Sequence, residues 1–146
     1  MLNLTLDKRK ETLERIKQIE TIKLNLIDAK AELEEVKKRN PLVRTKSKSE
    51  STASGNGDMY HVAIHFMMKE KELELLIMKY HCIVNDYNRG YRLLTDSEKE
   101  VLELRYHKNY SQQMTADTMK YSLARIQQLE ASLIGKMVNA MFFTKL

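Results

Sequence analysis

The chain has 146 residues, of which 42% are hydrophobic, with four glycines and one proline. This length holds one domain or two small ones, and so few helix-breaking residues favour helices over sheets. We therefore expect an all-α protein. The net charge of +5 favours an anionic partner without identifying it. No stretch approaches the roughly 20 apolar residues of a membrane-spanning helix, and no secretory signal is evident, so we expect a cytoplasmic protein with no membrane partner.

The first expected helix runs from about Asp7 to Arg39. Its apolar residues alternate spacings of three and four, as in the a/d seam of a coiled coil, at Ile19, Ile22, Leu26, Ala29, Leu33 and Val36. Leu13 and Ile16 continue this seam only across a three-residue stammer. The seam has two alternative partners: a second helix of the same chain, or another subunit.

Residues 40–57 are expected to form a flexible loop. They include the only proline, Pro41, and a run rich in Ser, Thr and Gly. Basic residues gather at and before this loop, at Lys37, Lys38, Arg39, Arg44, Lys46 and Lys48. They are interpreted either as a solubilising segment or as a mobile arm that contacts DNA phosphates.

A second helix is expected from about Asp58 to Asn88. The three-and-four spacing returns in its second half, at Leu73, Ile77, Tyr80, Val84 and Tyr87. The two helices are therefore compatible with an antiparallel hairpin, and we assign residues 1–90 to self-association. Cys82, the only cysteine, excludes an internal disulfide and is expected to be a small buried hydrophobe.

The sequence pattern of residues 91–146 predicts three further helices. Thr95 to Glu98 form a capping-box pattern, so a helix should start at about Asp96 and bury Val101, Leu102, Leu104 and Tyr106. His107 to Asn109 interrupt it, and Ser111 is an N-cap candidate for a short helix over Gln112 to Met119. After a turn at Lys120 and Tyr121, Ser122 caps a longer helix with a buried seam at Ile126, Leu129, Leu133, Met137 and Met141. A short helix, a tight turn and a longer helix predict a helix-turn-helix.

The side of the last helix opposite Ile126 is small and polar. Its outer row is Ala124, Gln128, Ala131 and Gly135, flanked by Arg125, Ser132 and Gln127. Small side chains let a helix enter the major groove, where Gln can pair with an adenine edge and Ala can contact a thymine methyl. The alternative is an amphipathic helix whose outer face is only solvated.

These residues resemble region 4 of the sigma-70 family of RNA polymerase specificity factors. The stretch Glu98 to Tyr106 resembles the pattern E-x-x-V-L-x-L-R-Y. The recognition-helix pattern S-x-x-R-V-x-Q-I-E-A is matched at Ser122, Arg125, Ile126, Gln128, Leu129, Glu130 and Ala131. Leu123 and Ala124 replace the Arg and Glu that usually contact promoter bases. Thr115 replaces an apolar residue, and Lys120 stands where the turn usually has Gly.

The whole layout is similar to the ArpU-like and RinA-like late transcription regulators of Gram-positive phages and prophages, which place helical segments ahead of such a domain. The resemblance implies a late-gene activator in a bacterial host cell. Its partners would be double-stranded DNA, a second copy of the chain, with a dimer favoured, and the host RNA polymerase. Two other classes stay open: a small terminase-like DNA-packaging protein, and a sigma-mimicking protein that binds RNA polymerase without touching DNA.

We expect two groups of DNA-contacting residues in 91–146. The base-contact candidates are Ser122, Arg125, Gln127 and Gln128. The backbone-contact candidates lie at turns and helix starts, and are Lys108, Ser111, Lys120 and Tyr121. No motif for catalysis is evident, so we do not expect an enzyme. His61 and His65 lie one helical turn apart but have no third ligand at a useful spacing, so we expect no metal or cofactor.

Overall fold

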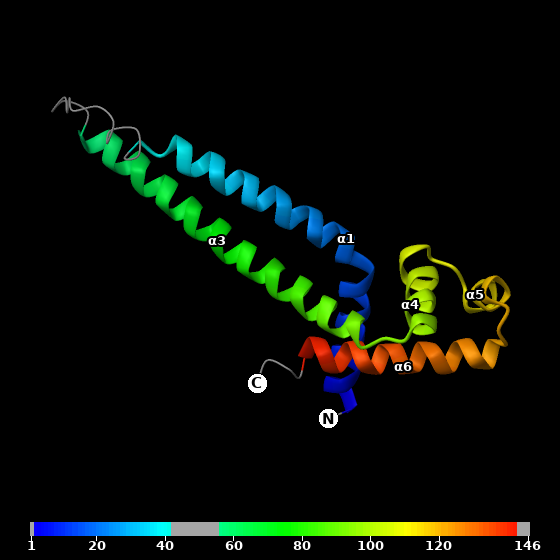
Figure 1. Cartoon of the computed structure of the whole chain (residues 1–146). Coiled ribbons are helices and arrows are strands. Elements are labelled where there is room, and N and C mark those ends of the chain that lie inside the picture. The colour runs from blue at the N-terminus through cyan, green and yellow to red at the C-terminus, as the bar shows by residue number, and fades with distance from the viewer. Residues whose placement is uncertain (1, 42–55, 143–146) are drawn as a thin grey trace. The chain divides into compact units, whose positions relative to one another are not determined.

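The computed structural model describes residues 2–41 and 56–142, and within these ranges every regular element is helical, as expected. In chain order the elements are α1 (Leu2–Arg39), α3 (Asn56–Arg92), α4 (Asp96–Leu102), the π-helix η2 (Glu103–His107), α5 (Gln112–Met119) and α6 (Leu123–Phe142) (Figure 1). None of the described helices is long and apolar enough to cross a bilayer. The chain divides into two compact units, residues 22–82 and residues 1–21 with 83–146.

Residues 22–82 form an antiparallel pair of helices, with the second half of α1 beside the first part of α3 (Figure 1). Apolar residues of both helices are buried, among them Leu26, Ala29 and Leu73. Polar contacts add to this packing, because Lys69 Nζ lies 3.7 Å from Glu32 Oε1 and the Asn40 amide donates to Glu70 at 3.4 Å. The seam predicted for the first helix thus lies on a buried face.

The upstream stammer is also present in α1. Ile16 and Ile19 are fully buried, Ile22 follows after another step of three, and Thr12 rather than Leu13 continues the buried row upstream. Two successive steps of three rotate the seam around the helix. This change of register falls beside the boundary between the two compact units, which lies after residue 21.

The flexible loop predicted over residues 40–57 lies largely outside the described residues, together with Arg44, Lys46 and Lys48. Lys37, Lys38 and Arg39 form the exposed last turn of α1, which ends at Arg39 as predicted.

The prediction for Cys82 was wrong, because its side chain is exposed. Cys82 follows the buried Leu73 by nine residues. At about 100° per residue this separation places the two side chains on opposite sides of α3. Cys82 therefore lies on the exposed face of α3, whereas its neighbour Ile83 is buried.

The core of the other unit is built around α6. Its seam residues are buried as predicted, at Ile126, Leu129, Leu133, Met137 and Met141, and α4 and α5 pack against it. The buried face predicted for the preceding helix is confirmed at Val101, Leu102, Leu104 and Tyr106. The capping box is present, with the Glu98 N–H donating to Thr95 Oγ1 at 3.2 Å and the Thr95 N–H donating to Glu98 Oε1 at 2.9 Å.

The last turns of α3 approach α6 closely at Gly90. A Cβ atom added to Gly90 would lie 2.7 Å from Met137 Sδ and 3.1 Å from Ala140 Cβ. Only glycine permits this separation of the two backbones. Gly135, on the opposite side of α6 from this contact, has no such neighbour within 4 Å.

Candidate nucleic-acid interface

Local hydrogen bonds fix each end of the helix-turn-helix. Ser111 Oγ accepts from the Met114 N–H at 3.1 Å and so caps α5, as predicted. Lys120 ends α5 in the left-handed conformation, with φ 61°, which explains why glycine is favourable in such a turn. Ser122 Oγ then accepts from the Arg125 N–H at 3.1 Å and caps α6. These contacts hold the turn between α5 and α6 in one conformation.

All four base-contact candidates lie exposed in the first two turns of α6 or at its cap. Ser122 serves as the cap, and Arg125 and Gln128 are exposed. The Gln127 amide is also exposed and donates to Gln112 Oε1 at 3.4 Å. Leu123, in the first turn, is 40% exposed. The start of α6 thus presents a mixed apolar and amide surface.

The backbone-contact candidates divide into two places. Lys120 and Tyr121 form the turn of the helix-turn-helix, whereas Lys108 and Ser111 lie before α5, at the end of η2 and at the N-cap of α5. Lys108, Ser111 and Lys120 are exposed, although the Ser111 hydroxyl is already used as a cap. The Tyr121 ring is 41% exposed and its hydroxyl lies 3.4 Å from Ser97 Oγ. One cation is therefore accessible at each end of α5, and an aromatic ring is accessible at the turn.

The outer row predicted on α6 is exposed at all four positions: Ala124, Gln128, Ala131 and Gly135. Its second half lies beside a residue that sequence reasoning missed. Arg9 of α1 lines a cavity of about 250 Å³ together with Ala131, Ile134, Gly135, Val138 and Asn139. No sequence signal links Arg9 to residues so distant along the chain, and its placement depends on tertiary packing. Arg9 thus supplies a positive charge beside the outer row of α6.

Glu130 anchors the domain from the buried side of α6. Its carboxylate accepts from the Tyr106 hydroxyl at 2.6 Å, the Gln112 amide at 2.9 Å and Arg105 Nε at 3.2 Å. Burial alone raises the pKa of Glu130, but the hydrogen bonds from Tyr106, Gln112 and Arg105 outweigh it and lower the pKa. Burial and the bond to Glu130 raise the pKa of the Tyr106 phenol, which stays protonated as a donor. The charged carboxylate therefore joins η2 and α5 to α6.

The π-helix positions two of these donors. The Lys108 N–H donates to the Glu103 carbonyl at 2.9 Å, a span of five residues that widens the turn. A wider turn brings successive side chains closer to one face, so both Arg105 and Tyr106 reach Glu130. Arg105 Nη1 also donates to the Tyr110 carbonyl at 2.7 Å, which fixes the chain reversal before α5.

A second buried carboxylate joins α4 to α6. Glu98 Oε1 accepts from Lys136 Nζ at 2.6 Å, and the Glu98 side chain is 2% exposed. Burial raises the pKa of Glu98, but hydrogen bonds from Lys136, Thr95 and Ser132 outweigh it and lower the pKa to about 2. Charged hydrogen bonds thus join α4 to α6 through Glu98 and η2 to α6 through Glu130, and such bonds are stronger than neutral ones.

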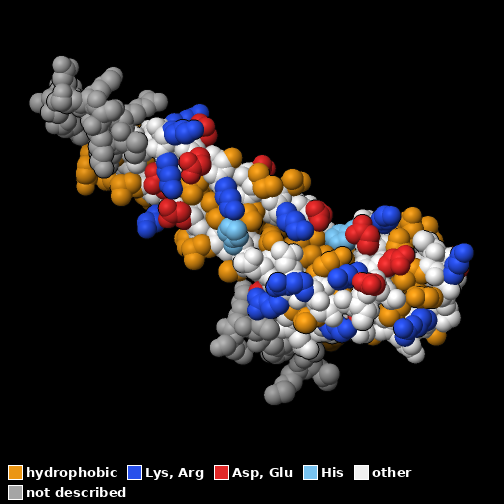
Figure 2. Space-filling view, viewed as in Figure 1, with side chains coloured by type: hydrophobic (Ala, Val, Ile, Leu, Met, Phe, Trp, Pro, Cys, Tyr) orange, Lys and Arg blue, Asp and Glu red, His pale blue; other side chains and the backbone are white. Residues whose placement is uncertain are grey.

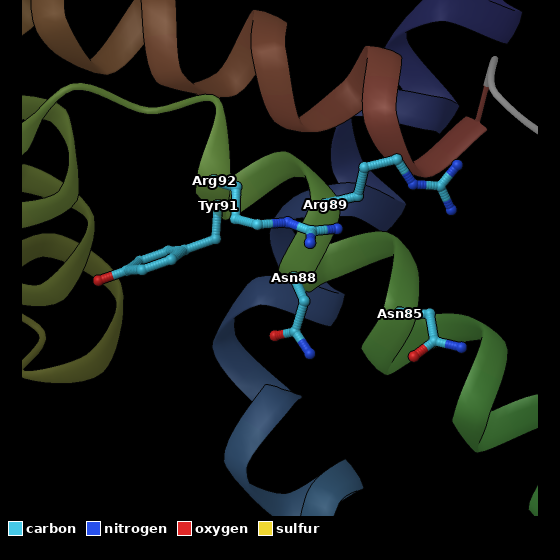
Figure 3. A pocket seen from close by; sticks show the side chains of 5 residues that line it. All are labelled: Asn85, Asn88, Arg89, Tyr91 and Arg92. Carbon is cyan, nitrogen blue, oxygen red and sulfur yellow. The ribbon is translucent and has the colours of Figure 1, made fainter.

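A separate open cavity of about 520 Å³ lies at the end of α3, lined by Asn85, Asn88, Arg89, Tyr91 and Arg92 (Figure 3). Arg89 donates to Asp86 at 2.7 Å, and the Tyr91 ring stacks on Tyr87 with 5.9 Å between centroids. In Figure 3 the Tyr91 side chain points away from the two asparagines. The five side chains contain no acid–base pair suited to catalysis, and none was singled out by the sequence.

Residues 92–137 match the family Sigma-70, region 4. No curated protein and no solved structure matches the chain. The matched span covers α4, η2, α5 and most of α6, and sigma-70 region 4 is a DNA-binding domain. The resemblance expected from the residues around Glu98 and Ser122 is thereby confirmed for this part of the chain. The protein carries a sigma-70 region 4 helix-turn-helix domain at residues 92–137.

Proposed function

We propose that this protein is a sequence-specific, DNA-binding transcription regulator that inserts the start of α6 into the major groove. The observation that carries the proposal is the exposed outer row of α6, with its small residues and Gln128, beginning directly after a capped turn. Recognition helices contact base edges with their N-terminal residues. Ser122, Arg125, Gln127 and Gln128 are therefore the proposed base contacts.

The chemistry of these residues favours a target rich in A·T pairs. An exposed Gln can pair with an adenine edge, and Leu123 and Ala124 can contact thymine methyl groups. The usual Arg and Glu of the family are absent at these two positions. We accordingly expect a site different from that of an ordinary sigma factor.

The backbone of DNA would be held at the two ends of α5. Lys108 and Lys120 supply charge, and Ser111 and Tyr121 supply hydroxyl groups at the ends of α5. Arg9 is a further candidate for a phosphate contact, because it lies beside the outer row of α6. Phosphate contacts fix orientation without reading sequence.

The biological setting of the proposal rests on the layout of the chain. Helical segments ahead of a region 4 domain resemble phage and prophage late-gene regulators, so we propose an activator that acts in the bacterial cytoplasm. In this proposal residues 91–146 bind DNA and contact the host RNA polymerase. Residues 1–90 mediate self-association, with a dimer favoured.

The test is a selection of bound fragments from a random DNA library by the full-length protein, followed by mobility-shift titrations on the enriched sequence. Gln128→Ala should weaken binding by about 1–3 kcal/mol and relax the preference at one base pair. Gln18→Ala is the matched control, since Gln18 is an exposed glutamine of α1 outside the helix-turn-helix. Lys120→Ala should weaken all sequences alike and reduce the salt slope by about one. Enrichment of no sequence would refute specific reading.

A second candidate function is favoured by the exposure of Leu123. An apolar residue at the start of α6 is also suited to a protein partner, as in a polymerase-binding protein that mimics a sigma factor. That candidate predicts no enriched DNA sequence, and capture of RNA polymerase that Leu123→Ser abolishes. The small terminase-like alternative predicts a ring whose mass is many times the 17.2 kDa of one chain.

A further inference from the structure

Helix α3 carries a second heptad seam besides the one buried against α1. We call it the outer seam. Its spacings are four, three, four, three and four, as at alternating a and d positions, and its residues are Ile64, Met68, Lys71, Leu75, Met78 and Cys82. All six lie within the compact unit formed by residues 22–82.

The outer seam is exposed along its whole length. Met68, Leu75 and Met78 are more than 60% exposed, whereas Leu73, two residues before Leu75, is 4% exposed. At about 100° per residue, the outer seam lies roughly opposite Leu73. Figure 2 shows hydrophobic side chains along the outer edge of this helix pair. A solvated helix face seldom repeats large apolar residues at heptad spacing, so this face is suited to another helix.

We infer that the outer seam pairs with the outer seam of a second copy of this chain, in a parallel two-stranded arrangement. Two neighbouring residues, Tyr60 and Met67, are 63% and 50% exposed and widen the apolar face beside the seam.

Charge determines the direction of the pairing. Glu74 and Lys79 are exposed on opposite flanks of the seam and five residues apart, which is the g-to-e spacing of pairs between parallel helices. Two-fold symmetry forms this pair twice. If the two outer seams paired in the antiparallel direction, Glu74 would face the partner's Glu74 and Glu72 would face the partner's Glu72. Like charges repel, so this direction is disfavoured.

Lys71 is the only charged residue in the seam. In the aligned parallel register its layer brings two lysines together, which costs stability because like charges repel. The long aliphatic stem of Lys71 can pack in the seam while its ammonium group stays in water, which limits this cost.

This inference deepens the self-association part of the proposed function and is independent of DNA reading. A paired outer seam would join two region 4 domains in one particle. Linked readers bind neighbouring sites more tightly than separate ones, because the second binding event becomes intramolecular.

The test is the mass of the full-length protein by light scattering and sedimentation over a wide concentration range, without DNA. The wild type should approach twice 17.2 kDa. Leu75→Lys should raise the dissociation constant of the dimer about 100-fold, since it replaces an apolar residue of each copy by a second ammonium group in addition to that of Lys71. Leu24→Lys is the matched control, because Leu24 is 62% exposed on α1, outside the seam. This control should dimerise like the wild type.

Two further variants test direction and remain informative if Leu75→Lys fails to fold. Glu74→Lys should weaken the dimer several-fold, and adding Lys79→Glu should restore it. Cys82 occupies an a position, so parallel pairing brings the two thiols together. Diamide should then take two electrons and two protons from them, forming one disulfide and its own hydrazine. Cys82→Ser should show no cross-link.

Several results would overturn the inference. They are a wild type that stays monomeric, a dimer that Leu75→Lys leaves intact, and equal loss in Leu24→Lys. A dimer without the Cys82 cross-link, or without charge-swap rescue, would refute the parallel arrangement. If the protein dimerises through the outer seam but the DNA selection enriches no sequence, the proposed reading of DNA is refuted and the inferred dimer is not.

Discussion

The close approach of α3 to α6 at Gly90 gives a sharp prediction for Gly90→Ala. The added methyl group would lie 2.7 Å from Met137 Sδ and 3.1 Å from Ala140 Cβ, and both neighbours are buried. Overpacking of this kind costs about 1–3 kcal/mol. The better helix propensity of Ala offsets up to about 1 kcal/mol of that cost. We expect a net loss of about 1–2 kcal/mol in the free energy of unfolding.

Gly135→Ala is the matched control on the same helix pair. Nothing lies within 4 Å of a Cβ at Gly135, so only the propensity gain remains, a stabilisation of about 0.5–1 kcal/mol. Urea unfolding followed by circular dichroism measures both variants, and hydrogen exchange of α6 peptides locates the effect. The packing argument is wrong if Gly90→Ala is as stable as Gly135→Ala, or if the exchange of α6 is unchanged.

Three other predictions concern single residues of the same unit. Thr115 is fully buried and its hydroxyl donates to the Ser111 carbonyl at 2.8 Å, so the similarly shaped Thr115→Val should change stability by less than about 1 kcal/mol in urea unfolding, and a larger loss would contradict this. Lys120→Gly should be more stable than Lys120→Ala by about 1 kcal/mol, because both lose the charge and only Gly relieves the positive φ; equal melting curves would refute the strain. The pKa of Glu98 falls from 4.5 to about 2 on folding, so its contribution is complete above pH 4.5 and is lost as the pH falls toward 2. Thermal unfolding from pH 6 to pH 2 should show this loss in the wild type and a smaller one in Glu98→Gln, whereas identical pH profiles would exclude Glu98 as the cause.

The helices of the region 4 domain could be predicted well because their ends are determined locally. Thr95, Ser111 and Ser122 each cap a helix through a hydrogen bond to a backbone N–H three residues later. Such contacts depend only on neighbouring residues, so a sequence pattern contains the whole signal. The buried seam of α6 was predictable for a related reason, because one face of a single helix is visible in its periodicity.

Features that depend on tertiary packing could not be predicted in the same way. We expected an interruption of the helix after Tyr106. We did not expect the π-helix that lets Arg105 and Tyr106 both reach Glu130. Glu130 matched a family pattern that does not state its partners. Arg9 reaches the outer row of α6 from the start of the chain. Such contacts join distant segments, and no local pattern encodes them.

Cys82 illustrates a different limit of sequence reading. Helix α3 has two apolar seams, and the pattern alone does not say which of them faces α1. The expectation that Cys82 is buried was wrong, because Cys82 lies on the exposed face of α3 although its neighbour Ile83 is buried. Position on the helix, measured from Leu73, resolves the ambiguity.

The two sides of α6 have different roles, and this bears on how the proposed DNA target could change. Glu130 holds the domain together from one side of the helix, and Ala124 and Gln128 lie on the other. Substitutions in the outer row leave the Glu130 carboxylate and its hydrogen-bond donors unchanged. Under the proposed function, exchanging residues of the outer row alone would change the DNA target while the domain folds in the same way.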